Sequence, residues 1–320
     1  MGCAMSHKGR VDVQPYDPTW PTLFDAEAVR VQRALSDNCV AIHPVGSTAV
    51  PGLVAKPKID IIAVVRHLCF DPEPLQAIGY TYRGGFNIPL RKSFTMRTVD
   101  RNINLHVFEE NDPEIELNLL FRDYLRDNPS VRNDYALLKY KLIAEDSNHE
   151  KNDSIYRGYT LGKNDFIQTV VKKSGFDKHR CVLCTHYAEW DAAKQFRHRF
   201  FFGPRGIKDG DTWTFNHKDH AHCVLYCGVD IVAYVHIQFL PDHRSVIRIL
   251  GIDTHDHRGA RVLMAYIDRW LKNIGVKSIH GAASQHNLRL YRDNGYTTMA
   301  FHEFDHHEHE FNDVPVGKIL

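Results

Sequence analysis

The order of apolar and polar positions predicts alternating strands and helices in the first half of the chain. Residues 59–65 form a continuous apolar run rich in β-branched side chains, which is typical of a strand buried on both faces. Residues 102–108 alternate instead, so we expect a strand with one apolar and one polar face. A loose apolar face within residues 11–45 predicts a short strand and then a helix. The charged amphipathic stretches 116–145 and 152–171 predict further helices.

The second half predicts a separate layered unit. Its expected order is strand, helix, three strands in meander spacing, helix, strand and helix. These elements cover residues 180–185, 189–200, 222–227, 231–239, 245–252, 260–273, 277–282 and 285–294, in that order. Gly295 is expected to cap the last helix, and the order is that of an α/β or α+β domain. The polar stretch 172–177 breaks the pattern, so we place the domains at residues 10–172 and 178–320.

Composition narrows the class of protein. A chain of 320 residues favours two domains over one core. The 40 basic and 39 acidic residues leave a net charge of +1, which gives no general attraction to nucleic acid or membranes. No apolar run approaches the roughly 18 residues of a transmembrane segment. Seven cysteines without a framework spacing suggest reduced thiols, so we expect a cytoplasmic protein.

The first residues match a lipidation signal. Gly2 stands where myristoylation would occur, and Cys3 is a candidate for palmitoylation. We favour the simpler interpretation of a tag remnant or an unstructured start, because one short match carries little information.

The segment from Gly46 to Asp60 carries the most specific candidate chemistry. Its Gly46-Ser47 turn leads through a Pro/Gly loop into the apolar strand that bears Asp60. Glycine lets backbone amides approach a phosphate closely, and a serine hydroxyl adds a donor. A carboxylate on the following strand can hold the metal that such a phosphate needs. The segment therefore has the organisation of a nucleotidyl-transfer site.

The carboxylate set for that chemistry is incomplete. Two-metal phosphoryl transfer needs two carboxylates two residues apart on one strand face and a third from a neighbouring strand. Ile62 stands in the second place, and the neighbouring strand offers His106. Two alternatives stay open: Asp60 and His106 hold a single divalent cation such as Mg²⁺, or Asp60 pairs with a nearby basic side chain. The candidate partners are Lys56, Lys58 and Arg101.

Ordered motifs over residues 10–170 resemble the GrpB (UPF0157) family. The motifs are Tyr16–Pro21, Gly46–Asp60, Leu105–Val107, Phe121–Pro129 and Tyr159–Lys163. The resemblance implies a nucleotidyltransferase-like mixed sheet with helices, and Asp60 as its catalytic candidate. It also implies a ligand pocket formed by Gly46, Ser47, Lys56, Arg101, His106 and Lys163. A cationic cluster around a Gly-Ser loop suits a phosphate-bearing or nucleotide-like ligand, and we favour binding over nucleotidyl transfer.

The second half resembles the GNAT acetyltransferases over residues 180–320. The resemblance rests on Arg248–Asp253, Gly259-Ala260 and the N-x-x-x-Y-x-x-x-G-Y sequence of Asn287–Tyr296. In that family two strands splay apart around the acyl-CoA thioester, and amides at a helix N-terminus contact the pyrophosphate. The resemblance implies that Tyr291 protonates the leaving thiolate as general acid and that Asn287 contacts the cofactor arm.

The pyrophosphate loop departs from the family pattern. GNAT members usually show Gln/Arg-x-x-Gly-x-Gly/Ala, whereas His255 and Arg258 stand here in the first position and in that of the first glycine. An arginine can contact phosphate itself, although its side chain crowds the backbone. The predicted cofactor-binding residues are Arg258, Gly259, Ala260, Arg261 and Asn287. The general base stays open among His217, His220, His222, His236 and Asp253.

Two clusters have the composition of metal sites. Cys181, Cys184, Cys223 and Cys227 have a zinc-like spacing on paper. Residues three apart in a strand point to opposite faces, and residues four apart lie roughly 13 Å apart, so we expect no zinc site there. The histidines of residues 217–222 and 301–310 suit surface runs that bind metal opportunistically. We therefore assign no metal ligands in this half.

The leading hypothesis is a cytoplasmic two-domain enzyme. Its second domain would transfer an acetyl or other acyl group from acetyl-CoA or a related thioester to a small-molecule amine. Its first domain would bind a nucleotide-like or phosphorylated ligand, with the acceptor as one candidate. In the alternatives, the first domain is an active nucleotidyltransferase with a degenerate GNAT sensor, or both domains only bind ligands.

Overall fold

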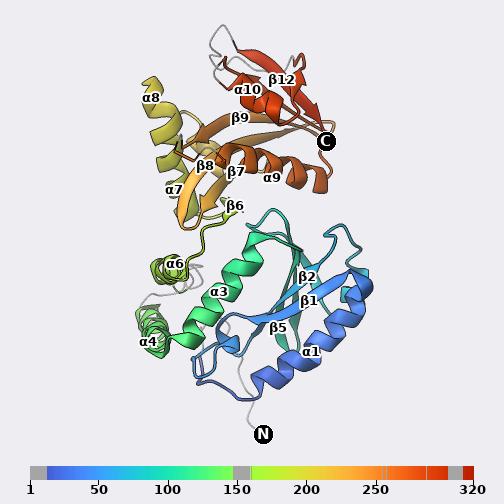
Figure 1. Ribbon diagram of the computed structural model, residues 1–320, viewed down its shortest axis with the longest axis vertical. Coiled ribbons are helices and arrows are strands. Elements are labelled where there is room, and N and C mark those ends of the chain that lie inside the picture. Colours follow the sequence, from blue (N-terminus) through green and yellow to red (C-terminus); the bar gives the residue numbers. More distant parts are fainter. Residues whose placement is uncertain are drawn as a thin grey trace. The chain divides into compact units, whose positions relative to one another are not determined.

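The computed structural model describes residues 13–146, 159, 161–253, 255–256, 258–285, 287–301 and 313–320. The lipidation signal at Gly2 and Cys3, and histidines 302, 306, 307 and 309, lie outside these residues. The chain divides into two compact units. Unit 1 comprises residues 1–84 and 91–177, and unit 2 comprises residues 85–90 and 178–320, as far as each is described. Figure 1 shows both units, with elements labelled where there is room.

Unit 1 is built on a five-stranded mixed sheet in the order β1-β2-β5-β4-β3. The strands are β1 Cys39–Val45, β2 Ile59–Val65, β3 Thr81–Gly84, β4 Arg91–Arg97 and β5 Asn102–Glu109. β2 and β5 run parallel, and the other neighbours run antiparallel. The predicted strand at residues 59–65 is confirmed. Ile61, Ala63 and Val65 are fully buried because β2 lies between two other strands.

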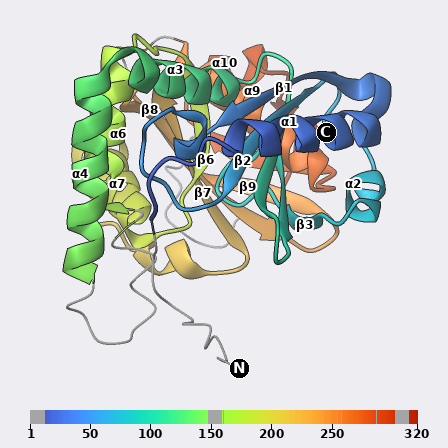
Figure 2. The ribbon, with the colours of Figure 1, turned by 90° about the horizontal axis from the view of Figure 1, so that it is seen from below.

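Helices pack on this sheet and on one another. They are α1 Trp20–Leu35, α2 Glu73–Ala77, α3 Pro113–Asp127, α4 Pro129–Asp146 and α6 Asn164–Lys173. α1 packs against β1 and β2, whereas α3 contacts α4 and α6, which lie side by side in Figure 2. The amphipathic stretch 116–145 forms two helices, because Pro129 pushes Asn128 out of the helical region, at φ −122° and ψ 81°.

Unit 2 is built on a seven-stranded sheet in the order β11-β12-β10-β9-β8-β7-β6. The strands are β6 His179–Leu183, β7 His220–Cys227, β8 Asp230–Leu240, β9 Arg244–Ile252, β10 Ser278–Ala283, β11 Thr297–Thr298 and β12 Val314–Ile319. β9 and β10 pair in parallel, and every other neighbouring pair is antiparallel. The predicted meander and the strand after the long helix are confirmed. β11 and β12 were not predicted, and β12 inserts between β10 and β11.

The helices of unit 2 follow the predicted order. They are α7 Tyr187–Arg197, a π-helical turn His198–Phe202, α8 Gly203–Arg205, a 3₁₀ turn Thr212–Asn216, α9 Gly259–Asn273 and α10 Leu288–Asp293. α9 buries Leu263, Ile267 and Leu271 completely, as its apolar spacing predicted. Gly295 follows α10 with φ +82°, which suits glycine. The fold class predicted from the sequence, two mixed α/β units, is confirmed.

Among the residues that the structure describes, no helix is both long and apolar enough to span a bilayer.

Candidate functional site

Unit 1 brings the Gly-Ser loop directly over Asp60. Gly46 has φ +70°, and a Cβ atom at this position would lie 2.8 Å from Oδ2 of Asp60. Only glycine combines this backbone conformation with so close an approach. Val45, just before the loop, is the register partner of Asp60. The chain thus places the first turn of the loop and the strand carboxylate together, as the sequence predicted.

Asn104 is the neighbour of Asp60 on the adjacent strand. The parallel register pairs Asp60 with Asn104 and Ile62 with His106. Asn104 Nδ2 donates a 2.7 Å hydrogen bond to Asp60 Oδ1. The position in which we expected His106 is therefore taken by an amide. Burial raises the pKa of Asp60, while Lys58 and the Asn104 hydrogen bond oppose that rise.

Lysine side chains surround this carboxylate. The ammonium groups of Lys56 and Lys163 lie 4.4 and 4.5 Å from the ring centroid of Tyr159. Burial lowers the pKa of Lys163 to about 8, and the positive charge of Lys56 adds to the effect. Burial, with Lys58 second, also lowers the pKa of Lys56. Crowded, poorly hydrated ammonium groups of this kind favour an anionic ligand, because it would neutralise their mutual repulsion.

Lys139 of α4 is the least expected member of the cluster. Its side chain is 1% exposed, and Nζ donates 2.7 Å hydrogen bonds to Ser47 Oγ and to the Val54 carbonyl. Nζ also lies 4.4 Å from the ring centroid of Tyr135. Burial, assisted by Lys163, lowers its pKa to about 7. Lys139 therefore ties the Gly-Ser loop to α4.

Two predicted pocket residues have other surroundings. Arg101 Nη1 lies 3.5 Å from Oε2 of Glu27 on α1, so the structure pairs Arg101 with this carboxylate and not with Asp60. His106 is placed beside Ile62, and its Nδ1 is buried with no hydrogen-bond partner among the described residues. Burial and the charge of Arg91 lower the pKa of His106 to about 3. His106 is consequently a neutral imidazole at pH 7.

In unit 2 the two parallel strands separate partway along. β9 spans nine residues and β10 spans six, yet their pairing ends at Ile247 and Gly281. A bulge in β9 at Arg248, opposite His236 and Ile237, follows directly after the last pair of β9 with β10. Beyond it, the backbone groups of both strands are free of each other. The opening between β9 and β10 is the feature that the GNAT resemblance implied.

Tyr291 of α10 points at this opening. A Cβ atom on Gly281 would lie 3.5 Å from Tyr291 Oη, so the hydroxyl lies against the last residue of β10 that pairs with β9. The side chain is 2% exposed, and burial raises the pKa of its hydroxyl. Asn287, one helical turn earlier, has a buried Oδ1 without a partner among the described residues. Asn287 thus presents a buried polar atom that the described fold does not use.

The N-terminus of α9 is capped from within the chain. The predicted residues Arg258, Gly259, Ala260 and Arg261 are its cap and first turn. Asp256 Oδ1 accepts 3.0 Å hydrogen bonds from the amides of Arg258 and Gly259. Two of the amides that the resemblance assigned to a pyrophosphate therefore contact a carboxylate. The aspartate two residues before Arg258 is the sequence signal that predicts this cap.

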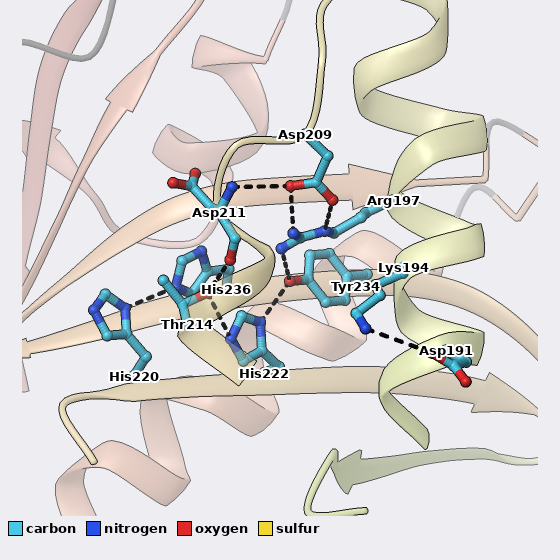
Figure 3. A network of polar contacts seen from close by, with 10 residues as sticks. All are labelled: Asp191, Lys194, Arg197, Asp209, Asp211, Thr214, His220, His222, Tyr234 and His236. Carbon is cyan, nitrogen blue, oxygen red and sulfur yellow. Dashed lines mark hydrogen bonds and ion pairs between the residues drawn. The ribbon is translucent and has the colours of Figure 1, made fainter. Parts of the chain in front are cut away.

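A polar network crosses the sheet face beside α7 (Figure 3). Arg197 is fully buried, forms an ion pair with Asp209 and donates to Tyr234 Oη at 3.1 Å. Tyr234 Oη lies 2.6 Å from His222 Nδ1. Burial and the charge of Arg197 lower the pKa of His222 to about 3. His222 is thereby a structural member of a satisfied network.

A pair of histidines lies beside this network. His220 Nδ1 lies 2.9 Å from His236 Nε2, and His236 Nδ1 is buried without a partner among the described residues. Burial lowers the pKa of both imidazoles. His236 pairs with Ile249, two residues beyond the last β9–β10 pair. Of the candidate bases, this pair therefore stands level with the opening.

Cys181 and Cys184 lie on opposite sides of the sheet, as strand geometry requires. Cys181 and Cys223 lie on one face of β6 and β7, with their Sγ atoms 3.1 Å apart. Cys184 belongs to the core on the other side of the strands, with Phe196 and Tyr234. Within the described ranges, the four cysteines do not form a common metal site.

Comparison with known proteins identifies the first half of the chain. The family model "GrpB protein" matches residues 10–173. UPF0157 protein YqkA of Bacillus subtilis is 37% identical over 171 residues, which are 52% of this chain and 48% of that protein. UPF0157 protein BH1888 of Halalkalibacterium halodurans is 38% identical over 175 residues, which cover 52% and 84%. The chain thus spans about half of the first of these relatives.

Solved structures align with each half. GrpB from Enterococcus faecalis has 30% identity and a TM-score of 0.46, covering 51% of this chain and 96% of its own. A GNAT-family acetyltransferase from Staphylococcus aureus has 10% identity and a TM-score of 0.39, covering 44% and 99%. A Bacillus subtilis acetyltransferase in complex with CoA has 16% identity and a TM-score of 0.35, covering 45% and 99%. Since the GrpB model matches half of the sequence, the chain belongs to the GrpB family.

Proposed function

We propose that unit 2 transfers an acyl group from acyl-CoA, with acetyl-CoA as the first candidate, to an amine. The observation that carries this proposal is the separation of β9 and β10 at Ile247 and Gly281, with the Tyr291 hydroxyl against Gly281. Unpaired strand backbone at such an opening offers hydrogen bonds to a thioester and its amide arm. Asn287 adds a buried acceptor without a partner in the described structure.

Tyr291 is protonated at neutral pH, whereas His220 and His236 are neutral imidazoles. In the proposed step, the amine nitrogen attacks the thioester carbonyl and the C–S bond breaks. The leaving thiolate takes the proton of Tyr291, whose raised pKa keeps the hydroxyl protonated at neutral pH. His236 accepts the proton of the attacking ammonium, directly or through His220. Burial lowers the pKa of both imidazoles, so both rings are neutral at pH 7 and have an unprotonated nitrogen that can take this proton.

Binding and chemistry are tested separately. Calorimetry with acetyl-CoA should give saturable binding that weakens at least about tenfold in Arg258→Glu, because a negative charge at the start of α9 repels the pyrophosphate. Tyr291→Phe should lower kcat with an amine acceptor about 100-fold and leave acetyl-CoA affinity unchanged. Wild-type turnover by Tyr291→Phe would refute the acid role. Absence of binding at millimolar acetyl-CoA would refute the function.

Unit 1 supports a second function, the binding of a phosphorylated ligand. The supporting observation is the set of crowded lysines around Gly46 and Ser47, with Lys139 and Lys163 at pKa values of about 7 and 8. Nucleotide or inorganic pyrophosphate should bind to the wild type, and Lys163→Met should weaken binding at least about tenfold. Lys141→Met is the matched control, because Lys141 lies on exposed α4 surface. Equal binding by all three proteins would overturn this assignment.

A further inference from the structure

Three donor atoms from distant parts of the sequence meet beside the start of α9. They are an imidazole nitrogen of His179, the thiol sulfur of Cys227 and a carboxylate oxygen of Asp256, all within 4.8 Å of one another. His179 begins β6, Cys227 ends β7, and Asp256 precedes α9. We propose that these three residues bind a divalent cation of the zinc class. This proposal does not depend on the acyl-transfer function of unit 2.

The strand register explains why two of these donors are neighbours. His179 and Cys227 are directly paired residues of antiparallel β6 and β7, so their side chains leave the sheet on the same face. Such cross-strand partners have Cβ atoms about 5 Å apart, which suits two ligands of one ion. This arrangement differs from the cysteine spacing considered in the sequence, because the ligands are adjacent across strands and not along one strand.

The loop before α9 aims the third donor. Asp256 N donates to the Asp253 carbonyl at 3.1 Å, and Asp256 Oδ1 is held by the amides of Arg258 and Gly259. The carboxylate is thereby fixed, with Oδ2 lying 2.6 Å from His179 Nε2. A metal ligand whose second oxygen accepts backbone hydrogen bonds is pre-oriented in the way that outer partners orient known metal sites.

The donor set indicates the class of ion. Nitrogen, sulfur and oxygen donors in equal number suit Zn²⁺ or Co²⁺, whereas Mg²⁺ and Ca²⁺ prefer oxygen ligands alone. Three protein ligands leave one position of a tetrahedral ion for water or for a phosphate oxygen. The His179 and Asp256 side chains are 13% and 17% exposed, which leaves an ion access from solvent. The competing arrangement is a simple His179–Asp256 ion pair with no metal affinity.

Cobalt is the most informative probe. The full chain, freed of metal by chelator dialysis, is titrated with Co²⁺ and followed by absorption. We expect one equivalent that gives tetrahedral d–d bands and a thiolate-to-cobalt charge-transfer band, and that Zn²⁺ displaces. The charge-transfer band separates this site from the histidines of residues 302–309, which carry no sulfur. A variant in which these four histidines are asparagine removes the opportunistic binding that they would contribute.

Matched variants decide between the two arrangements. Cys227→Ser should abolish the charge-transfer band, whereas Cys69→Ser, at an exposed cysteine, should leave it intact. Asp256→Asn keeps an oxygen for the two capping amides but removes the charge, and should weaken Co²⁺ binding at least about tenfold. Circular dichroism of each variant verifies that the fold persists. Absence of the band in the wild type, or its persistence in Cys227→Ser, would overturn the proposal.

Discussion

The buried ammonium of Lys139 makes the stability of unit 1 depend on pH in the alkaline range. Lys139 has a pKa of about 7 in the folded chain, against 10.5 for an exposed lysine. The folded state therefore releases the proton of Lys139 near pH 7, whereas the unfolded chain keeps it up to about pH 10.5. Because the unfolded state binds more protons between these values, the free energy of unfolding rises with pH in this window. Below about pH 7 the contribution is constant.

The expected magnitude follows from these two values. Each pH unit inside the window contributes about 1.4 kcal/mol for one titrating group. Near the folded-state pKa the group is half protonated, so the rise from pH 7 to pH 9 is about 2 kcal/mol. Lys139→Met removes this contribution, since methionine does not titrate. It also leaves Ser47 Oγ and the Val54 carbonyl without their donor, which lowers stability at every pH by about 1–3 kcal/mol.

The measurement is a comparison of urea unfolding at pH 7 and pH 9. Trp20 is the tryptophan of unit 1, so a background with Trp190, Trp213 and Trp270 changed to phenylalanine reports on this unit. The control is Lys141→Met, on the same helix, with a side chain 70% exposed. From pH 7 to pH 9, the free energy of unfolding should rise by about 2 kcal/mol less in Lys139→Met than in the control. A difference below about 0.5 kcal/mol would show that Lys139 keeps an ordinary pKa.

Three further predictions concern single positions. In urea unfolding, Gly46→Ala should destabilise unit 1 by at least about 1 kcal/mol more than Gly84→Ala. Both glycines have positive φ, but only at Gly46 would a Cβ atom lie 2.8 Å from Asp60. Equal losses in the two variants would contradict this steric argument. In the same assay, Arg197→Met should lower the stability of unit 2 by about 3–5 kcal/mol, because the Asp209 carboxylate and the Tyr234 hydroxyl lose their partner. A loss under about 1 kcal/mol would refute a buried ion pair at this position. His106 has a folded-state pKa of about 3, below that of the unfolded chain near 6.5, so its contribution to stability is complete above pH 6.5 and is lost as pH falls towards 3. His106→Leu should therefore lose about 2 kcal/mol less than wild type between pH 6.5 and 4.5, and parallel titrations would rule this out.

Local sequence patterns predicted most of the helices and strands. The strands that they did not predict depend on pairing between segments distant in sequence. The apolar run 59–65 and the spacing within α9 determine their elements without reference to the rest of the chain. β3 and β4 carry mixed residues and β1 contains Pro44, so their strand conformation depends on neighbours distant in sequence. β11 has only two residues, which is too short for any periodicity to appear.

The candidate sites also combine residues that local motifs indicate with residues that only the folded structure brings together. Gly46, Asp60 and Tyr291 stand in sequence motifs, and the structure places Gly46 beside Asp60 and Tyr291 beside Gly281. Lys139 escaped prediction because a lysine within a charged helix ordinarily faces solvent. Asn104 required the register of β2 and β5, which no local pattern specifies. The approach of His179 to Asp256 joins residues 77 positions apart and depends on the whole of unit 2.

The insertion of β12 between β10 and β11 has a consequence for biosynthesis. Ribosomes produce β10 and β11 before β12, although β12 separates them in the finished sheet. While residues 314–319 are still inside the ribosome, the β10 edge has no partner and offers a row of unpaired amides and carbonyls to other chains. Unit 2 therefore completes its sheet only after this strand has emerged, and nascent chains stalled before it would be substrates for chaperones.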